Sequence, residues 1–446
     1  MLKRDISATF VGNLALIVIM LGTATITSRA LGPAGRGLLA MAFLIPTITS
    51  TFALLGQEVV NNTFAGLYKE ARTVLFFHSL FFTAVGAVVS SLVIGAYFWW
   101  LPVPRGKFAL LDQPIIWAMC FIAPMTMFNT LMFGLLRGSG RVVTAAMLRI
   151  VNGLVLLVLL FLFLVVLRHG VLAAVWVNVV ASLIGGGLTV LCLRKDIDWR
   201  SRWWDREMLM KSLRFGWPIC LATFAGFLVY RIDQGIQGYM VDEFQLGLYT
   251  QAVGVAEHLK VLPSSISTAF LPRLANELET RRQQVPAVFR MTVIASAAAM
   301  VGTAFVGGPG IVLLFGWEFL GSIPPFLLLL PGVAILGGAS ILASDLLTRQ
   351  KPRYNMTVAW VTLAVSVTLN LSLIPVLGIC GSAIAASLSY LVAMMLWIRF
   401  YVRESGRAIH ELWPGRADLV LVWRTGWEVL GKLVSRIRRR PAAAEA

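Results

Sequence analysis

The sequence predicts an all-α polytopic membrane protein with about twelve transmembrane helices in two pseudo-symmetric six-helix bundles, followed by an amphipathic C-terminal helix. Three observations support this prediction. Hydrophobic residues make up 58% of the 446 residues and charged residues 13%, which is about half the charged fraction of a soluble domain. Apolar runs of about twenty residues, long enough to cross a bilayer as a helix, recur along the chain. Basic residues gather in alternate connecting loops.

The first predicted bundle occupies residues 1–193. Its apolar runs reach the length that a helix needs to cross a hydrocarbon core of about 30 Å. The first run is too long for the hydrophobic part of a secretory signal, so we expect it to be retained as a helix. The predicted spans of this bundle are 7–28, 38–60, 74–100, 114–135, 142–167 and 171–193.

A charged, tryptophan-bearing segment, 194–212, is typical of a cytoplasmic linker at the membrane surface between two bundles. The second predicted bundle is 213–402. Two sequence echoes connect the bundles: LLRGSGRV and LTRQKPRY each lead from a fourth to a fifth span, and GVLAA and GICGS each open a sixth. Because six is even, the bundles should be parallel repeats about the membrane normal. The second bundle's predicted spans are 213–236, 246–270, 287–315, 320–346, 355–376 and 379–401.

The C-terminal tail, 403–446, combines apolar and basic residues at helical spacing. Its apolar positions from Leu419 to Ile437 recur every three to four residues, and basic residues occupy other positions. This pattern predicts an amphipathic helix on the cytoplasmic leaflet. A thirteenth span is the alternative, but it would place Arg424, Glu428 and Lys432 in hydrocarbon.

The net charge of +17 indicates membrane orientation and not nucleic-acid binding. If Lys3 and Arg4 are cytoplasmic, the loops place roughly thirty basic residues inside and about five outside. The sequence also contains no GxxxxGK[ST], HExxH or GxSxG motif, and the cysteines form no CxxC pair. We therefore expect a transporter and not an enzyme, with no catalytic residue, no metal, no cofactor and no nucleic-acid partner.

Charged side chains inside lipid-spanning helices are costly and usually face a cavity or a partner, so each marks a candidate site. Arg149 lies deep in the fifth predicted span, and Asn152, one turn later, is expected to line the same surface. The alternative for Arg149 is a side chain that reaches back to the membrane interface. In the seventh span, Arg231 and Asp233 are two residues apart, so at least one of them needs a partner elsewhere.

Two other charged pairs have simpler local explanations. Glu257 and Lys260 are three residues apart and share a helix face, so a local salt bridge is the alternative to a role in transport. Asp345 and Arg349 are one turn apart and are expected to form a bridge at a helix end. His258 has no second histidine at ligand spacing, which argues against a metal site.

The stretch SRALGPAGRG, followed by LLAMAFLIPTITSTFALLGQ, resembles the opening of the polysaccharide transporter (Wzx-like) branch of the MOP flippase superfamily. YRIDQ, LGLYTQA and FLPRLA, in that order, are similar to its second half. The resemblance implies a MOP/MATE-like fold. It also implies a flippase of the bacterial cytoplasmic (inner) membrane that moves polyprenyl-pyrophosphate-linked sugar units to the outer leaflet by alternating access. A central cationic cavity, and cation coupling at Asp233, are further implications.

We therefore expect a lipid-linked oligosaccharide flippase with both termini in the cytoplasm. Residues expected to line its substrate cavity are Arg149, Asn152, Arg231 and Lys260. Residues expected to respond to a proton or sodium ion are Asp233 and Glu257. Arg29 is assigned to the outer gate. The expected partners are the lipid-linked oligosaccharide and the bilayer, with a polysaccharide polymerase and glycosyltransferases as candidates.

Two alternatives stay open at this point. A MATE-type cation-coupled drug antiporter shares the fold, but its cargo is usually cationic, so a net negative cavity would favour it. A non-transporting scaffold of a polysaccharide assembly complex is the second alternative. A dry interior between the bundles would favour the scaffold.

Overall fold

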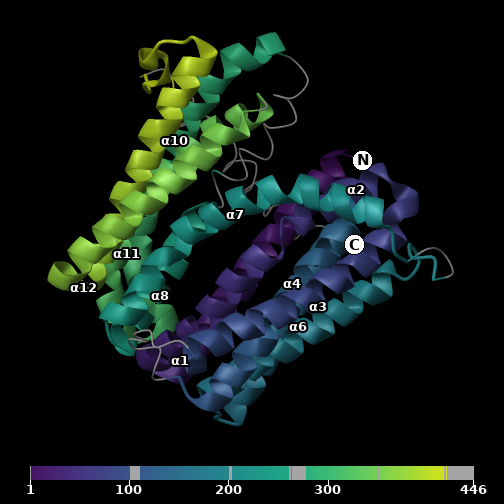
Figure 1. Cartoon of the computed structure of the whole chain (residues 1–446). Helices are drawn as coiled ribbons and strands as arrows, with labels where there is room; N and C mark the ends of the chain where they lie inside the picture. Colours follow the sequence, from purple (N-terminus) through teal and green to yellow (C-terminus); the bar gives the residue numbers. More distant parts are fainter. Residues whose placement is uncertain are drawn as a thin grey trace, which may run out of the picture. The chain divides into compact units, whose positions relative to one another are not determined.

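In a computed structural model of the chain, the described residues form helices and the turns next to them, with no strand among them (Figure 1). Those residues are 2–100, 111–199, 203–260, 263, 278–349, 351–415 and 418. Within these ranges, nine helices are long and apolar enough to cross a membrane. The chain is therefore a multi-pass membrane protein, as the run lengths predicted.

Contacts divide the chain into two compact units. Unit 1 comprises Met1–Val253, Gly310–Pro325 and Leu363–Ser382, and unit 2 comprises Gly254–Pro309, Phe326–Thr362 and Ala383–Ala446. Unit 1 thus contains the whole first predicted bundle together with parts of the sequence assigned to the second. The division into two six-helix bundles stays a prediction.

Two of the long helices each join two predicted spans at a glycine. α1 (Leu2–Ala53) has non-helical backbone at Gly32, with φ 66°, and α12 (Pro352–Ser405) has it at Gly378, with φ 58°. Positive φ values suit glycine because a Cβ would collide with the neighbouring carbonyl group. Gly32 therefore separates the first predicted span from the second, and Gly378 separates the eleventh from the twelfth. The total of about twelve spans stays a prediction.

The second predicted span was placed too far along the chain. Its helix ends at Ala53 and not at residue 60, because Leu55 and Gly56 take φ values of 49° and 72°. Such left-handed angles interrupt the helical hydrogen-bond ladder. α2 (Gln57–Leu67) then begins as a separate helix.

The seventh helix begins earlier than predicted, inside the segment 194–212. α7 (Arg206–Met240) is capped by Asp205, whose carboxylate accepts hydrogen bonds from the backbone N–H groups of Glu207 and Met208. A carboxylate at this position satisfies N–H groups that have no helical partner, so it fixes the start of the helix. Of the eighth predicted span, α8 (Glu243–Glu257) and the short turn η5 (His258–Lys260) are described, and most of the rest lies outside the described residues.

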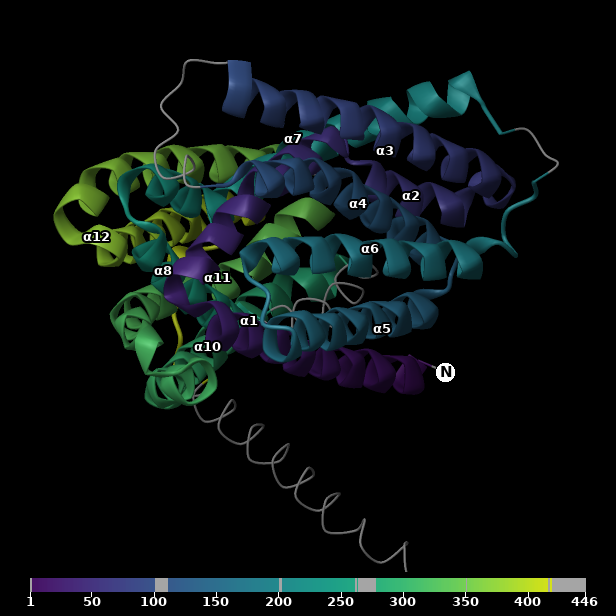
Figure 2. The ribbon, with the colours of Figure 1, turned by 90° about the horizontal axis from the view of Figure 1, so that it is seen from below.

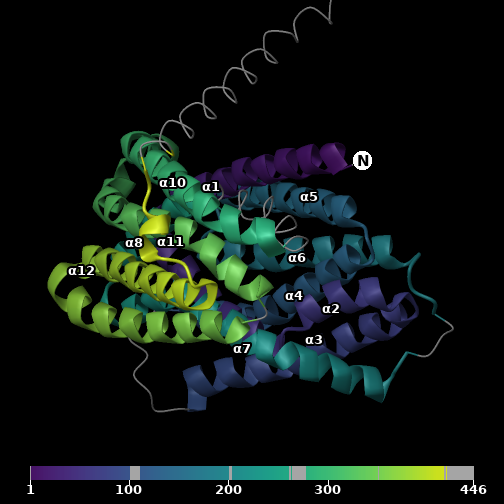
Figure 3. The same cartoon turned by 90° about the horizontal axis from the view of Figure 1, so that it is seen from above.

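The helices of unit 1 pack around a core of large apolar side chains that includes Met41, Ile94 and Met119, each 0% exposed. The elements of unit 1 not yet given are η1 (Lys69–Ala71), α3 (Arg72–Gly95), η2 (Ala96–Trp100), α4 (Gln113–Gly138), α5 (Val142–Leu160), η4 (Phe161–Val166), α6 (Val171–Leu193) and η6 (Trp317–Ser322). α4 lies against α3, α2 and α6 (Figures 1 and 3), and α5 lies against α1 and α6 (Figure 2).

The tryptophans of the linker pack on α3. The ring of Trp199 meets Phe76 edge to face at 5.9 Å between centroids, and Trp204 meets Phe81 in the same way at 5.2 Å. Aromatic rings with one polar atom suit the boundary between membrane and water. These contacts fasten the linker to unit 1.

Unit 2 contains most of α10 (Leu278–Phe315) and α11 (Ile323–Thr348) and the outer parts of α12, which lie side by side in Figure 1. Phe289, Ile341 and Tyr401, one from each of these helices, are at most 2% exposed and share one apolar cluster. The three helices are therefore held together by a dry contact near their ends.

The segment after α12 folds back on unit 2. Gly406, with φ 69°, ends the helix, and a single short turn, η7 (Ile409–Leu412), follows. Leu412 is 4% exposed and joins the same apolar cluster as Phe289 of α10. Part of the tail 403–446 thus packs on the transmembrane helices. The amphipathic helix predicted farther on lies outside the described residues.

Arg290 of α10 holds this segment at two points. Its Nε donates to the Oδ2 atom of Asp418 at 2.8 Å, and its Nη1 donates to the backbone oxygen of Glu411 at 2.5 Å. Asp418 also accepts a hydrogen bond from the backbone N–H of Gly415 at 2.9 Å. We call this set of four residues the Arg290 clasp.

The Arg290 clasp is expected to open in acid. The N–H of Gly415 and the guanidinium of Arg290 both favour the ionised carboxylate, so they lower the pKa of Asp418 below its usual value. Stability from such a group is fully present above the unfolded-chain pKa of about 3.9. It is lost as the pH falls through the lower, folded-state pKa.

The mobility of a spin label at residue 415 measures this opening. It should stay low from neutral pH down to about pH 5 and rise only below about pH 4. Asp418→Asn should raise the mobility at neutral pH, whereas Glu207→Gln, at an exposed site on α7, should not. Low mobility in Asp418→Asn at neutral pH would contradict the assignment.

α1 and α8 approach each other with backbone against backbone. A Cβ at Gly247 would lie 1.8 Å from the carbonyl oxygen of Pro33, and one at Gly37 would lie 1.9 Å from that of Glu243. Overpacking of this kind forces a backbone shift that typically costs about 1–3 kcal/mol. Gly247→Ala is therefore expected to lower the thermal unfolding midpoint of the detergent-solubilised protein. Gly254→Ala, on the same helix, meets no atom within 4 Å and should not lower it.

Candidate functional site

Asp233 is buried in α7 and held by donors from two directions. Its carboxylate is in a residue only 5% exposed. The Tyr249 hydroxyl of α8 donates to Oδ2 at 2.5 Å, and the backbone N–H of Gln234 donates to Oδ1 at 2.7 Å. A carboxylate in a membrane helix needs polar partners. The spacing of Arg231 and Asp233 predicted that at least one of them has a partner outside α7, and for Asp233 that partner is Tyr249.

More buried polar side chains surround this pair within unit 1. Gln237, one turn after Asp233 on α7, is 0% exposed, and neither of its amide atoms bonds to a described residue. On α8, Gln251 accepts a hydrogen bond from the Ser28 hydroxyl of α1 at 3.0 Å. The helices α1, α7 and α8 therefore bring together polar groups that an apolar core would not need.

Arg29 connects α1 to the end of α10. Its Nε donates to the Leu314 carbonyl oxygen at 2.8 Å and its Nη2 to that of Leu313 at 2.7 Å. The last carbonyl groups of a helix have no helical partner and carry a partial negative charge, so a guanidinium stabilises them. Arg29 thus caps α10, and its role in a gate stays a prediction.

α1 also contains Arg36, which was not predicted as a site residue from the sequence. Its Nη1 donates to the Thr27 hydroxyl at 3.4 Å, while its Nε is buried and has no hydrogen-bond partner among the described residues. Arg36 belongs to the motif SRALGPAGRG. Arg36 falls between the predicted spans 7–28 and 38–60, so no charge inside a span marked it, and only the structure places it within α1.

α5 places Arg149 and Asn152 in different surroundings. Arg149 is exposed. The Asn152 side chain packs against Gly185 of α6: a Cβ added at Gly185 would lie 2.5 Å from Asn152 Oδ1. Asn152 Oδ1 is buried and has no hydrogen-bond partner among the described residues. The part that either residue plays in binding cargo stays a prediction.

The ion pairs expected within a helix, Glu257–Lys260 and Asp345–Arg349, are both formed. Lys260 Nζ lies 3.1 Å from Glu257 Oε1, and Arg349 Nε lies 2.5 Å from Asp345 Oδ2. Both pairs belong to unit 2. The other predicted site residues, which belong to unit 1, are Arg29, Arg149, Asn152, Arg231 and Asp233.

Arg231 lies partly buried on α7. Tyr249 and Gln251 were not predicted as site residues from the sequence, although both stand in LGLYTQA, because their hydrogen-bond partners lie on other helices. Within the described part of the chain, no group of three or more histidine, cysteine or acidic residues could hold a metal ion.

Comparison with known proteins gives matches of three kinds: a family, a relative and solved structures. Residues 2–277 match the model of the family described as "Polysaccharide biosynthesis protein". The probable flippase AglR of Haloferax volcanii is 26% identical over 278 residues, which are 60% of this chain and 57% of that protein. The match therefore spans little more than half the length of this relative.

Solved structures share the fold. A structure of the lipid II flippase MurJ, in an inward closed conformation, matches with a TM-score of 0.72 and 13% identity, covering 93% of this chain and 90% of that one. An inward-facing multidrug resistance MATE family transporter of the MOP superfamily matches with a TM-score of 0.68 and 14% identity, covering 88% and 94%. The predicted MOP/MATE-like fold is confirmed.

Proposed function

The chain belongs to the polysaccharide biosynthesis protein family, and from this premise we propose that it is a flippase for lipid-linked oligosaccharides. It moves polyprenyl-pyrophosphate-linked sugar units from the inner to the outer leaflet of the bacterial cytoplasmic membrane by alternating access. Both of its termini are cytoplasmic. The similarity to the probable flippase AglR and the fold shared with the lipid II flippase MurJ support this proposal.

The observation that carries the proposal is the polar interior of α1, α7 and α8. Asp233, Gln237 and Tyr249 are each at most 5% exposed, although α7 is apolar enough to cross a membrane. Placing such groups in a helix that crosses hydrocarbon costs free energy, so they indicate a functional site. A transporter that passes a polar headgroup through the bilayer requires polar surfaces of this kind.

Cationic side chains bind the pyrophosphate of the cargo. Arg231 and Arg149 are the candidates from the sequence, and the structure adds Arg36, whose Nε has no hydrogen-bond partner among the described residues. Guanidinium groups match phosphate oxygens with two parallel hydrogen bonds. Lys260 and Asn152 complete the proposed set.

A proton or sodium ion couples to transport at Asp233. The ionised carboxylate accepts the hydrogen bond from Tyr249 and so links α7 to α8. Binding of a cation neutralises this charge and weakens that link, which gives ion binding a route to helix packing. Glu257 is the second coupling candidate, although its ion pair with Lys260 competes for its charge.

Reconstituted flipping tests the proposal. Proteoliposomes that contain the full chain should translocate a fluorescent polyprenyl-pyrophosphate oligosaccharide faster than protein-free vesicles. Arg36→Gln and Arg231→Gln should each slow translocation about tenfold or more, the value of one lost charged hydrogen bond. Arg194→Gln, at an exposed site, is the matched control and should leave the rate unchanged.

Each alternative has its own outcome in the same assay. Transport of a fluorescent organic cation without translocation of the oligosaccharide would support a drug antiporter. A folded protein that transports neither would support a scaffold. Either result would overturn the proposed function.

A further inference from the structure

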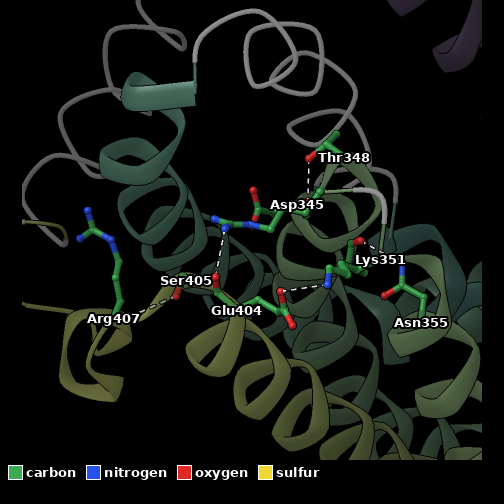
Figure 4. Close-up of polar contacts among 9 residues, drawn as sticks. Asp345, Thr348, Lys351, Asn355, Glu404, Ser405 and Arg407 are labelled. Carbon is green, nitrogen blue, oxygen red and sulfur yellow. Dashed lines mark hydrogen bonds and ion pairs between the residues drawn. The ribbon is translucent and has the colours of Figure 1, made fainter.

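One end of unit 2 is formed by the start and the end of α12 together. Lys351 Nζ lies 3.7 Å from Glu404 Oε2, and the Tyr354 hydroxyl donates to Glu404 Oε1 at 2.6 Å. The rings of Tyr354 and Phe400 stack at 4.5 Å between centroids. Figure 4 shows Lys351 and Glu404 facing each other at this end, with Asp345 of α11 nearby.

This end is strongly basic on its outer surface. Exposed cationic side chains gather there: Lys351, Arg353, Arg399 and Arg403. Glu404 forms an ion pair with Lys351, and Asp345 forms an ion pair with the partly buried Arg349. Arg353, Arg399 and Arg403 form no ion pair with any described residue. Glu404, the carboxylate next to Arg403, already pairs with Lys351, so the exposed cationic groups at the two ends of α12 outnumber this carboxylate.

Two apolar side chains in the turn that follows α12 are exposed. In the turn after α12, Leu412 points inward and is 4% exposed, whereas Ile409 is 57% exposed and Trp413 is 71% exposed. The Arg290 clasp and Leu412 fix this turn to unit 2, so the two exposed side chains are held in place. Tryptophan beside exposed cations is typical of side chains at the membrane–water boundary.

We propose that this end of unit 2 binds the headgroups of anionic phospholipids. Arg353, Arg399 and Arg403 contact the phosphates, and Ile409 and Trp413 enter the interfacial layer beside them. α12 is apolar enough to cross a membrane, so its two ends lie at the bilayer surface, where lipid phosphates are found. The outward apolar side chains favour lipid over an acidic protein partner. This inference does not depend on the proposed transport activity.

Native mass spectrometry of the purified full chain tests the proposal with two probes, phosphatidylglycerol and phosphatidylcholine. The wild type should bind phosphatidylglycerol more tightly. The variant R353Q/R399Q/R403Q should bind it at least about tenfold more weakly, because each basic residue near the surface adds attraction to anionic lipid. R353K/R399K/R403K keeps the positive charge at the same three positions and should keep most of the wild-type affinity.

The proposal is overturned if the wild type does not distinguish the two lipids, or if the control variant loses as much affinity as the patch variant. A second measurement does not depend on these arginine variants. A spin label at Trp413→Cys, with the four native cysteines (Cys120, Cys192, Cys220 and Cys380) replaced by alanine, reports depth in vesicles.

The spin label should be shielded from a water-soluble relaxation agent, and more so when phosphatidylglycerol is added to phosphatidylcholine vesicles. R436Q/R438Q/R439Q/R440Q, which changes only arginines near the C-terminus, should not alter this shielding. Equal exposure to water in both vesicle types would contradict lipid binding and favour a protein partner. Loss of shielding in R436Q/R438Q/R439Q/R440Q would assign the effect to residues 436–440 and overturn the proposal.

Discussion

Replacing Asp345 with alanine is expected to lower the free energy of unfolding by about 3–5 kcal/mol, the cost of breaking a buried ion pair from one side. The Asp345 side chain is 0% exposed and accepts from Arg349 Nε at 2.5 Å. Arg349 also lies over the ring of Tyr401, 5.8 Å from its centroid. Without Asp345, this guanidinium keeps its burial but loses its counter-charge. Chemical unfolding of the detergent-solubilised protein measures the loss.

A less buried pair in the same unit provides the matched control. Glu257 and Lys260 are 28% and 27% exposed, so Glu257→Ala should cost less than about 1 kcal/mol. The double variant Asp345→Leu/Arg349→Met should regain most of the stability that Asp345→Ala loses, because an apolar pair does not need a counter-charge. If Asp345→Ala and Glu257→Ala lowered the free energy of unfolding equally, burial of the Asp345–Arg349 pair would not increase the cost of breaking it.

Replacing Asp233 with asparagine is expected to reduce flipping at least about tenfold and to remove its dependence on a proton or sodium gradient. Asparagine keeps the shape of the side chain and can still accept the hydrogen bond from Tyr249. It cannot bind a proton or a cation through a negative charge. Flipping rates in proteoliposomes, with and without an imposed gradient, measure both effects.

Two further variants test the hydrogen bond and the specificity of the effect. Tyr249→Phe removes the donor and keeps the carboxylate, so flipping should slow and the gradient dependence should weaken, because the link from Asp233 to α8 is lost. Asp242→Asn changes an exposed acid just before α8 and should leave transport unchanged. Gradient-dependent flipping by Asp233→Asn at the wild-type rate would exclude Asp233 from coupling.

The sequence alone determined the fold class, because the length of an apolar run and the charge of its flanking loops are local properties. It also predicted the ion pair Asp345–Arg349 and offered Glu257–Lys260 as an alternative to a transport role, since helix geometry brings residues three or four apart to one face. Charge placed inside a span marked Asp233 as a residue in need of a partner.

Only the tertiary structure decided which partner each buried group meets. Asp233 pairs with Tyr249 on another helix, and Arg29 caps carbonyl groups that lie up to 285 residues away. Such pairs depend on how neighbouring helices are turned and shifted against each other. That register is set by packing, as at the Gly37 and Gly247 contact between α1 and α8, and by no local periodicity. For the same reason, the docking of Leu412 on unit 2 was not predictable from the basic pattern of the tail.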